Sequence, residues 1–351
     1  LALRAEVFFA ADGAIATLLQ AEFPGLTCLS LPGYRVKYAG SGWKLPLKML
    51  GQAPRILQAI RQERKWLKGV VAKFGINGVI SDNRYGLHHP DIPCVFMTHQ
   101  LTIRAGNVFI ERLLRSFNFR FINHFTECWV PDEPGEMNYA GSLSHPPVMP
   151  SVPVRYTGIL SRLHPVPAMV VPNHLFVSIS GPEPQRSLFE NRLIDQLSHY
   201  NFTATVVRGL PGEQRMVPST NNLRFFNHLP AGELEKEMAK ADLVISRSGY
   251  STVMDLARMG KKSILIPTPG QTEQLYLATY LQGKGFALAG KQENFELEAL
   301  LDDARAFFAK DGMSSDSLSA GPGHLWLGAN TGANDKLPLL VERFVQQVLN
   351  K

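Results

Sequence analysis

The sequence contains few cysteines and no long apolar run, and these absences exclude several classes of protein. Its three cysteines, Cys28, Cys94 and Cys128, lie far apart without a CxxC pair, so they predict reduced packing residues rather than a disulfide framework or a zinc site. No segment approaches the roughly 20 successive apolar residues of a membrane-spanning helix. No signal peptide opens the chain, which leads us to expect a soluble protein of the cytoplasm.

Two kinds of nucleotide-binding motif are also absent. No GxGxxG sequence follows any predicted strand, which argues against a dinucleotide-dependent dehydrogenase. No DNA- or RNA-binding motif accompanies the basic residues, so we expect no nucleic-acid partner.

The positive charge is concentrated in the first half of the chain. The 351 residues carry a formal net charge of +6, and residues 1–155 contain 17 Lys and Arg against 11 Asp and Glu. Residues 35–73 contain ten basic residues and one acidic residue, with aromatic and aliphatic side chains between them. Such a stretch fits an anionic membrane surface, where each basic residue contributes on the order of 1 kcal/mol. The alternative is an ordinary solvated helix face.

Strand and helix patterns alternate along the chain, as in α/β proteins. Short apolar strands are predicted at residues 6–10, 25–31, 79–81, 94–97, 175–179, 203–208, 223–227, 241–246 and 263–267. Helical spacing is found at residues 14–22, 54–74, 185–200, 232–240, 252–259 and 337–349. A segment rich in Gly, Ser and Asn, residues 311–335, is expected to form a loop.

The length exceeds what one hydrophobic core usually serves, so we expect two doubly wound domains. A proline-rich segment at residues 131–167 marks the change of domain. We therefore assign residues 1–155 to an N-terminal domain on the acceptor side, which we expect to lack its first strand. Residues 156–335 form the second domain, and residues 336–351 a closing helix that packs back toward the first domain.

The most informative segment is residues 245–276, ISRSGYSTVMDLARMGKKSILIPTPGQTEQLY. A small apolar strand runs into a glycine turn at residues 247–252, and a helix is predicted to follow from Thr252. The amino end of a helix offers unpaired N–H groups and a positive dipole end, which suit a diphosphate. An ordinary β-α-β unit with a Ser or Thr N-cap gives the same local pattern.

A second polar loop favours a ligand site. Residues 267–274, PTPGQTEQ, leave the carboxyl end of the next strand rich in side chains that form hydrogen bonds. Open α/β sheets bind ligands at this edge. Two polar loops at neighbouring strand ends are difficult to explain by packing alone.

On these residues the chain resembles the GT-B glycosyltransferases of family 28, among them the N-acetylglucosaminyltransferase of peptidoglycan synthesis. It resembles more weakly the UDP-glycosyltransferases that act on small molecules. The likeness is most specific over residues 241–280, extends over 175–240 and continues more weakly through the first half. It implies a GT-B fold, in which two doubly wound Rossmann-like domains face a cleft.

In that family the UDP-sugar donor lies against the second domain. The resemblance implies that Ser180 and Gly181 contact the diphosphate and that the backbone of Phe226 pairs with uracil. Asp255 stands at the position of a glutamate that holds the ribose. The implied phosphate-binding turn consists of Arg247, Ser248, Gly249, Tyr250, Ser251 and Thr252. The implied sugar-binding loop consists of Gln271, Thr272, Glu273 and Gln274, with Leu275 where the peptidoglycan enzyme has a second glutamine.

The resemblance also implies chemistry by inverting displacement, in which a base deprotonates the acceptor hydroxyl and UDP leaves. The family's usual base, a histidine after the first strand, has no counterpart in this sequence. His99 and Asp82, which follow neighbouring predicted strands, are our candidates for this role, and Asn83, Arg84, Tyr85 and Gln100 are further candidate acceptor contacts. A structural histidine and a helix-capping aspartate are the alternatives. The sequence has no DxD motif, so we expect no essential metal.

The sequence thus predicts an inverting hexosyl- or N-acetylhexosaminyl-transferase. Its donor is a UDP-sugar, and its acceptor is a lipid-linked or amphiphilic molecule. We expect it to act as a peripheral protein at the inner face of the membrane. Two alternatives stay open, a GT-B UDP-sugar epimerase and a non-catalytic donor-binding module that requires a partner.

Overall fold

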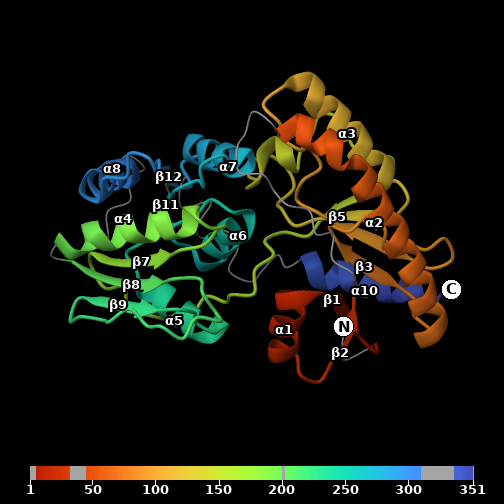
Figure 1. Cartoon of the computed structure of the whole chain (residues 1–351), viewed down its shortest axis with the longest axis horizontal. Coiled ribbons are helices and arrows are strands. Elements are labelled where there is room, and N and C mark those ends of the chain that lie inside the picture. The colour runs from red at the N-terminus through yellow and green to blue at the C-terminus, as the bar shows by residue number, and fades with distance from the viewer. Residues whose placement is uncertain (1–4, 32–44, 200–201, 310–335, 351) are drawn as a thin grey trace. The chain divides into compact units, whose positions relative to one another are not determined.

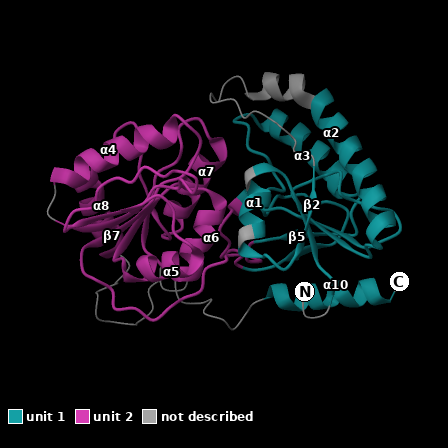
Figure 2. Cartoon of the chain, turned by 60° about the horizontal axis from the view of Figure 1, so that its bottom comes forward, with its two compact units in different colours: residues 1–131, 142–158, 335–351 teal, residues 132–141, 159–334 magenta. Residues whose placement is uncertain are grey.

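The computed structural model of the protein describes residues 5–31, 45–199, 202–309 and 336–350. It divides the chain into two compact units, shown in different colours in Figure 2. Unit 1 contains residues 1–131, 142–158 and 335–351, and unit 2 contains residues 132–141 and 159–334. Residues 132–141 were assigned from the sequence to the first domain but lie with the second unit. The expected loop at 311–335 and the basic residues at 35–44 lie outside the described residues.

Unit 1 is built around short parallel strands (Figure 1). A four-stranded sheet has the order β3-β4-β5-β6, and β1 pairs with β2 in a separate two-stranded sheet. Its strands are β1 (Phe8–Ala11), β2 (Thr27–Ser30), β3 (Val79–Asp82), β4 (Cys94–Met97), β5 (Glu127–Val130) and β6 (Val154–Tyr156). Its helices are α1 (Gly13–Glu22), α2 (Leu45–Phe74), α3 (Val108–Ile122), the short 3-10 helix η2 (Gly141–Leu143) and α10 (Lys336–Leu349).

Apolar side chains pack on both faces of the four-stranded sheet of unit 1, as is usual for a parallel sheet. Alternate residues point to opposite faces, so Phe96 packs with α3 on one face while Val95 and Trp129 point to the other. Helix α10 covers this second face, where the Phe344 ring lies 6.0 Å from that of Trp129, edge to face. Gly78 allows this close packing, because a Cβ atom there would lie 2.7 Å from a methyl carbon of Val348. The last helix of the chain therefore completes the core of the first unit (Figure 1).

Unit 2 is a doubly wound domain with a six-stranded parallel sheet of order β12-β11-β10-β7-β8-β9. Its strands are β7 (His174–Ser178), β8 (Thr203–Val207), β9 (Leu223–Phe226), β10 (Leu243–Ser246), β11 (Ser263–Leu265) and β12 (Leu288–Ala289). Its helices are α4 (Gln185–His199), α5 (Ala231–Lys240), α6 (Tyr250–Met259), α7 (Thr272–Gly283) and α8 (Leu297–Ala309). Helices α4 and α5 lie on opposite faces of the sheet in Figure 1.

The core of unit 2 forms where α4 and α8 pack on one face of this sheet. Phe189 from α4 contacts Phe295 edge to face, with ring centroids 5.4 Å apart. Strand residues such as Val177 and Ile245 complete the cluster and are fully buried. This core keeps the carboxyl ends of the central strands in fixed positions.

Two predicted boundaries near the candidate site are wrong. Helix α6 begins at Tyr250 rather than Thr252, and α7 begins at Thr272, inside the segment predicted as a loop. The Tyr250 ring is buried, so packing draws the start of α6 into the predicted turn. Leu277 and Leu281, four residues apart, are buried and anchor α7. Helices α3 and α8 and strands β5, β6 and β12 were not predicted from the sequence.

The buried side chain of His88 in unit 1 gives a test of this packing. Its ring lies 4.9 Å from that of His124, and burial, then the nearby Arg64, His124 and His89, lowers its pKa from 6.5 to about 4. Between these two pH values the unfolded chain binds the proton and the folded chain does not. We therefore expect the free energy of unfolding to decrease as the pH falls through this window, and to be independent of His88 above it.

Urea unfolding followed by circular dichroism would measure this slope in the wild type and in His88→Gln. The variant should lose a contribution of about one proton to the slope within the window. An unchanged slope in His88→Gln would show that other groups cause it.

Candidate functional site

The candidate donor site lies at the topological switch point of the sheet in unit 2. Strands β7 and β10 are neighbours, and the chain leaves their carboxyl ends toward opposite edges of the sheet. The turn at residues 179–184 follows β7, and residues 247–249 follow β10. Ligands of doubly wound domains bind in the crevice at this point. The structure thus brings together two loops that are separated by more than sixty residues of sequence.

The amino end of α6 lies at this switch point, and its N-cap residue is a glycine. Gly249 is the N-cap residue in an extended conformation, and the N–H of Val253 donates to its carbonyl oxygen at 3.0 Å. Gly249 has no side chain that could cap the helix, so the ordinary Ser or Thr N-cap considered above is not present. Ser251 is exposed and Thr252 half-buried in the first turn. This end of the helix has the chemistry of an anion site, because its first N–H groups and its dipole both favour negative charge.

Arg247 is buried, and its guanidinium connects the loops around the site through hydrogen bonds. Its guanidinium donates to the carbonyl oxygens of Gln185 at 2.9 Å and Ser180 at 3.4 Å. It also donates to those of Ile266 and Pro267 at 3.3 and 3.4 Å. Burial lowers the pKa of this guanidinium to about 10, which the charge of Glu293 opposes. The side chain therefore holds the turn at residues 247–249 in place, and its burial leaves the backbone of residue 247 for the direct contact that the resemblance implied.

Gln274 lies in the first turn of α7, where both its backbone and its side chain are held. The Ser248 hydroxyl donates to its carbonyl oxygen at 2.7 Å, and its side-chain Oε1 accepts the N–H of Thr268 at 2.8 Å. Its Nε2 lies beside Gly249, since a Cβ atom built on that glycine would be 4.0 Å away. The amide of Gln274 thus connects the loop after β11 with the start of α6.

The other residues of the predicted sugar loop surround this amide. Gln271 is the N-cap residue of α7 and makes no capping bond with its side chain. Thr272 and Glu273 are half-buried in the first turn. Leu275, where the resemblance has a glutamine, has 58% of its side chain exposed. The structure therefore places Glu273 and Gln274 in one helical turn.

The turn after β7 touches the loop after β11. Gly181 has a φ of +106°, which other residues rarely adopt. A Cβ atom there would lie 3.3 Å from the hydroxyl of Thr268 and 4.0 Å from Nε of Arg247. Ser180, its neighbour, is half-buried. Gly181, Gly249 and Gln274, which the resemblance assigned to donor binding, therefore lie in one region of unit 2.

Asp255 lies one turn into α6 and is already bound to another segment. Its Oδ1 accepts the hydroxyl of Ser161 at 2.5 Å. Burial raises the pKa of this carboxyl, while the Ser161 hydroxyl and the charge of Arg162 oppose the shift. Arg162 is an exposed cation near the site that sequence reasoning missed. It stands in a loop without a recognisable motif, and its electrostatic effect on Asp255 identifies it.

Phe226 ends the edge strand β9, two strands from β7. By strand spacing this is about 10 Å along the same edge of the sheet. Its carbonyl oxygen accepts the N–H of Arg208 at 2.8 Å, and the guanidinium of Arg224 lies 5.1 Å from its ring centroid. The carbonyl therefore keeps one lone pair for the base contact that the resemblance implied.

Asp82 and His99 lie at neighbouring strand ends in unit 1. Asp82 ends β3 opposite Met97 of β4, and His99 follows two residues later. The protein around the Asp82 carboxyl raises its pKa by desolvation, whereas the charge of His99 lowers it. The side chain of Asp82 is accessible, and a loop rather than a helix follows it, so it caps no helix in the described residues. The structure brings the two predicted groups close enough to interact electrostatically.

The neighbouring candidates in unit 1 have structural contacts. The guanidinium of Arg84 binds the buried carboxylate of Glu63, which also accepts the N–H of Gly86 at 3.0 Å. The Tyr85 hydroxyl donates to Asn118, and its ring stacks on Phe96 in the core. These contacts hold the loop after β3 and support the position of Asp82.

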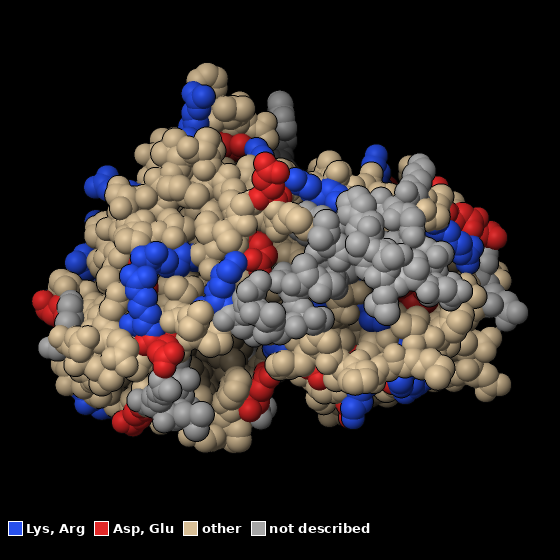
Figure 3. Space-filling view, turned by 180° about the vertical axis from the view of Figure 1, so that it is seen from behind, with Lys and Arg blue, Asp and Glu red and all other residues tan. Residues whose placement is uncertain are grey.

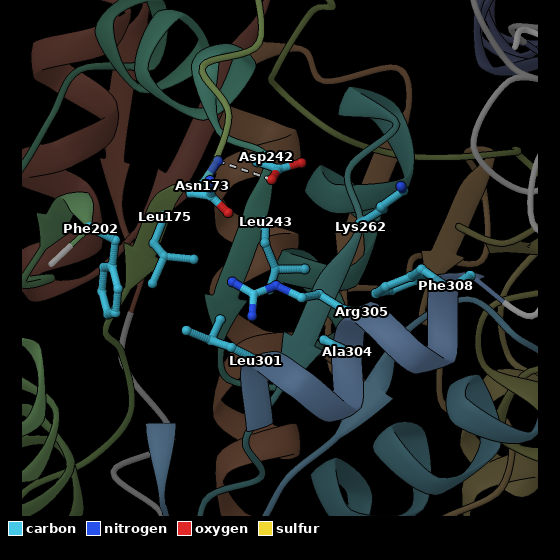
Figure 4. A pocket seen from close by; sticks show the side chains of 11 residues that line it. Asn173, Leu175, Phe202, Asp242, Leu243, Lys262, Leu301, Ala304, Arg305 and Phe308 are labelled. Atoms are coloured by element: carbon cyan, nitrogen blue, oxygen red, sulfur yellow. Dashed lines mark hydrogen bonds between the residues drawn. The ribbon is translucent and has the colours of Figure 1, made fainter. Parts of the chain in front are cut away.

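A separate cavity of about 230 Å³ lies at the opposite edge of the sheet in unit 2 (Figure 4). Leu175 and Leu243, near the amino ends of β7 and β10, line it together with Lys262 and Phe308. Parallel strands place their amino and carboxyl ends at opposite edges, so this cavity is not part of the candidate donor site.

The described residues contain no group of three His, Cys, Asp or Glu side chains that could hold a metal ion. Within the same part of the chain, no helix is long and apolar enough to cross a membrane. The cysteines in the described ranges, Cys28, Cys94 and Cys128, are free thiols.

Comparison with protein families and curated proteins finds relatives of the second unit. Residues 212–314 match the family described as the glycosyltransferase family 28 C-terminal domain. The UDP-N-acetylglucosamine–N-acetylmuramyl-(pentapeptide) pyrophosphoryl-undecaprenol N-acetylglucosamine transferase of Methylobacterium radiotolerans is 45% identical over 87 residues, which cover 24% of this chain and 22% of that protein. Its counterpart in Methylobacterium nodulans is 35% identical over 124 residues, 35% of this chain and 31% of that protein. The chain thus spans less than a third of the length of either relative.

Solved structures resemble the fold over nearly the whole chain. The glycotransferase of kitacinnamycin has a TM-score of 0.62 at 15% identity and covers 98% of this chain and 92% of its own. MurG of Acinetobacter baumannii has a TM-score of 0.54 at 15% identity, with coverages of 97% and 91%. The predicted GT-B fold and the predicted resemblance to the family 28 glycosyltransferases are confirmed.

Replacing Arg247 tests whether it organises the site. Arg247→Lys keeps the charge but cannot reach four carbonyl oxygens or stack on Phe189, whose ring centroid lies 4.4 Å from the guanidinium carbon. We expect the free energy of unfolding to fall by about 2 to 4 kcal/mol. Arg305→Lys is the control, because Arg305 is exposed and its replacement should change stability by less than about 0.5 kcal/mol. Equal stabilities of the two variants in denaturant unfolding would contradict the assigned role.

Proposed function

We propose that the protein transfers a hexosyl or N-acetylhexosaminyl group from a UDP-sugar to a lipid-linked or amphiphilic acceptor at a membrane surface. The observation that carries this proposal is the amino end of α6 at the switch point of unit 2, where the N-cap residue is Gly249 and the side chain of Gln274 lies beside it. The curated relatives are named as transferases that use UDP-N-acetylglucosamine, which supports the choice of donor.

Each part of the donor has a chemically suitable place in this proposal. The diphosphate lies at the first turn of α6 and the glycine turn at Gly181, because backbone N–H groups there favour anionic oxygens. Glu273 and Gln274 bind sugar hydroxyls, since a carboxylate accepts and an amide both accepts and donates hydrogen bonds. Asp255 holds the ribose through the carboxylate oxygen that Ser161 leaves available.

The proposed reaction is a single inverting displacement. A base removes the proton of the acceptor hydroxyl, the acceptor oxygen forms a bond to the anomeric carbon, and the bond from that carbon to the phosphate oxygen breaks. The electron pair leaves on UDP, where the amino end of α6 stabilises the negative charge. Asp82 is our candidate for the base, with His99 beside it, because a raised carboxyl pKa makes it a better proton acceptor. We expect no essential metal in this step.

An exposed apolar surface on α3 supports the membrane part of the proposal. We call Val108, Phe109 and Leu113 the α3 tip; their side chains are 63%, 79% and 64% exposed. Asn107 caps the helix by accepting hydrogen bonds from the N–H groups of Phe109 and Ile110, which stabilises the first turn that carries the tip. Exposed arginines, Arg112 and Arg120, lie on the same helix.

This surface has the composition of a peripheral membrane contact. Apolar side chains that enter the interface beside cations that bind anionic headgroups form such contacts. Figure 3 shows several Lys and Arg side chains over unit 1, at the left of the view. We therefore propose that unit 1 docks on the inner face of the cytoplasmic membrane.

Two substitutions separate the proposed roles in the donor site. Glu273→Ala should lower the rate of UDP-sugar use about 10- to 100-fold and leave UDP affinity within about twofold, because in this proposal Glu273 contacts the sugar and not the UDP part of the donor. Asp255→Ala should weaken UDP itself about tenfold. Isothermal titration with UDP and a donor-hydrolysis assay would measure both.

Ser161→Ala is the matched control for Asp255. It removes the hydrogen bond at Oδ1 but leaves the carboxylate for the ribose, so UDP affinity should stay close to that of the wild type. Equal losses of UDP affinity in Ser161→Ala and Asp255→Ala would show that Asp255 acts only by anchoring the 159–163 segment. A wild-type protein that binds no nucleotide would refute the proposed function.

The α3 tip can be tested with vesicles. Phe109→Ser combined with Leu113→Ser should reduce binding to phosphatidylglycerol vesicles at least about tenfold, since burial of each apolar side chain contributes roughly 1.5 kcal/mol or more. Leu188→Ser is the control, because this leucine is 54% exposed but lies in unit 2. Sedimentation of the double variant with vesicles as efficient as that of the wild type would rule out docking through this surface.

A further inference from the structure

The hydroxyl of Thr268 is buried at the candidate donor site without a hydrogen-bond partner. Thr268 is 2% exposed, and no group in the described part of the chain donates to its Oγ1 or accepts from it. The residue is not loosely placed, because Gln274 accepts its backbone N–H at 2.8 Å. Native proteins satisfy the large majority of buried polar groups, so an exception at a ligand site requires an explanation.

The position of this hydroxyl relates it to the glycine turn after β7. A Cβ atom built on Gly181 would lie 3.3 Å from Thr268 Oγ1. Gly181 has no side chain, so the backbone of this turn lies close to the hydroxyl. Its φ of +106° lies in a region where glycine moves at little steric cost. The hydroxyl therefore lies next to the turn that we assign to the diphosphate.

The groups around the hydroxyl have the charge that a phosphate requires. The Nε atom of Arg247 lies 4.0 Å from the same Cβ position on Gly181, so a cation is close. The amide Nε2 of Gln274 lies beside Gly249, the N-cap residue of α6. Among the described residues, Thr268 Oγ1 and Arg247 Nε are the groups within 4 Å of this Gly181 position, and the charge of Glu293 acts on Arg247.

We propose that Thr268 is a donor-binding residue whose hydroxyl donates a hydrogen bond to a phosphate oxygen of the nucleotide-sugar. A small shift of the Gly181 turn exposes the hydroxyl when the donor binds, and the phosphate supplies the partner that it lacks. The inference rests on the proposed function, because it assumes a nucleoside diphosphate at the switch point. It adds a specific contact from the loop after β11 to the anion site at the start of α6.

Ser263, in the strand that precedes the loop of Thr268, provides a matched control. Its side chain is fully buried, and its Oγ also has no hydrogen-bond partner in the described residues. It begins β11, however, at the opposite edge of the sheet from Thr268. Ser263→Ala therefore removes the same kind of unpaired hydroxyl away from the candidate site.

The test compares Thr268→Val, Thr268→Ser and Ser263→Ala in the full chain. Valine keeps the shape of threonine without its hydroxyl, and serine keeps the hydroxyl. Without ligand, Thr268→Val and Ser263→Ala should unfold at the wild-type temperature or above it, since each removes an unpaired buried hydroxyl. In titrations with UDP, Thr268→Val should bind about tenfold more weakly, while Thr268→Ser and Ser263→Ala bind like the wild type.

The possible results separate this inference from the proposed function. UDP affinity of Thr268→Val equal to that of the wild type would overturn the inference and leave the proposed function in place. A clear drop in the unfolding temperature of Thr268→Val without ligand would also overturn it, because the hydroxyl would then have a structural partner. Failure of the wild type to bind UDP would refute the proposed function itself, and the inference with it.

Discussion

The buried guanidinium of Arg247 is the contact on which the candidate donor site depends. Its hydrogen bonds to Gln185, Ser180, Ile266 and Pro267 connect the start of α4 with the loops after β7 and β11. Carbonyl groups at the ends of buried strands need donors, and one planar cation supplies several at once. Burial of the charge is costly, and the carbonyl dipoles and the Phe189 ring offset that cost. The loops are thereby set in place before any ligand arrives.

Other features of the candidate donor site lower the stability of the fold. The N-cap residue of α6 is a glycine, Gly181 adopts a conformation that favours glycine, and the buried hydroxyl of Thr268 has no hydrogen-bond partner among the described residues. A protein selected for stability alone would replace each of these features. Their concentration at one switch point fits a site whose unpaired groups are completed by an anionic ligand.

Unit 1 has two different surfaces that the proposed reaction needs, a polar edge of the sheet and an apolar helix end. Asp82 and His99 lie at the carboxyl edge of its sheet, where Glu63 and Arg84 hold the adjoining loop. The α3 tip presents apolar side chains to solvent on a capped helix. Helix α10 fills the back of the sheet, so the chain's last residues stabilise this unit. An amphiphilic acceptor requires both a polar reacting end and an apolar surface nearby.

The sequence by itself determined the α/β alternation, the GT-B resemblance and the glycine turn between β10 and α6, because periodicity and glycine are local signals. It did not determine that α6 begins at Tyr250, since an aromatic residue fits a turn until a core buries it. Nor could it show that Arg247 points inward, that Ser161 binds Asp255 across 94 positions, or that the Thr268 hydroxyl has no partner in the part of the chain that the structure describes. Only the tertiary structure decided these points, because a side chain's direction and partners depend on packing between segments that are distant in the chain.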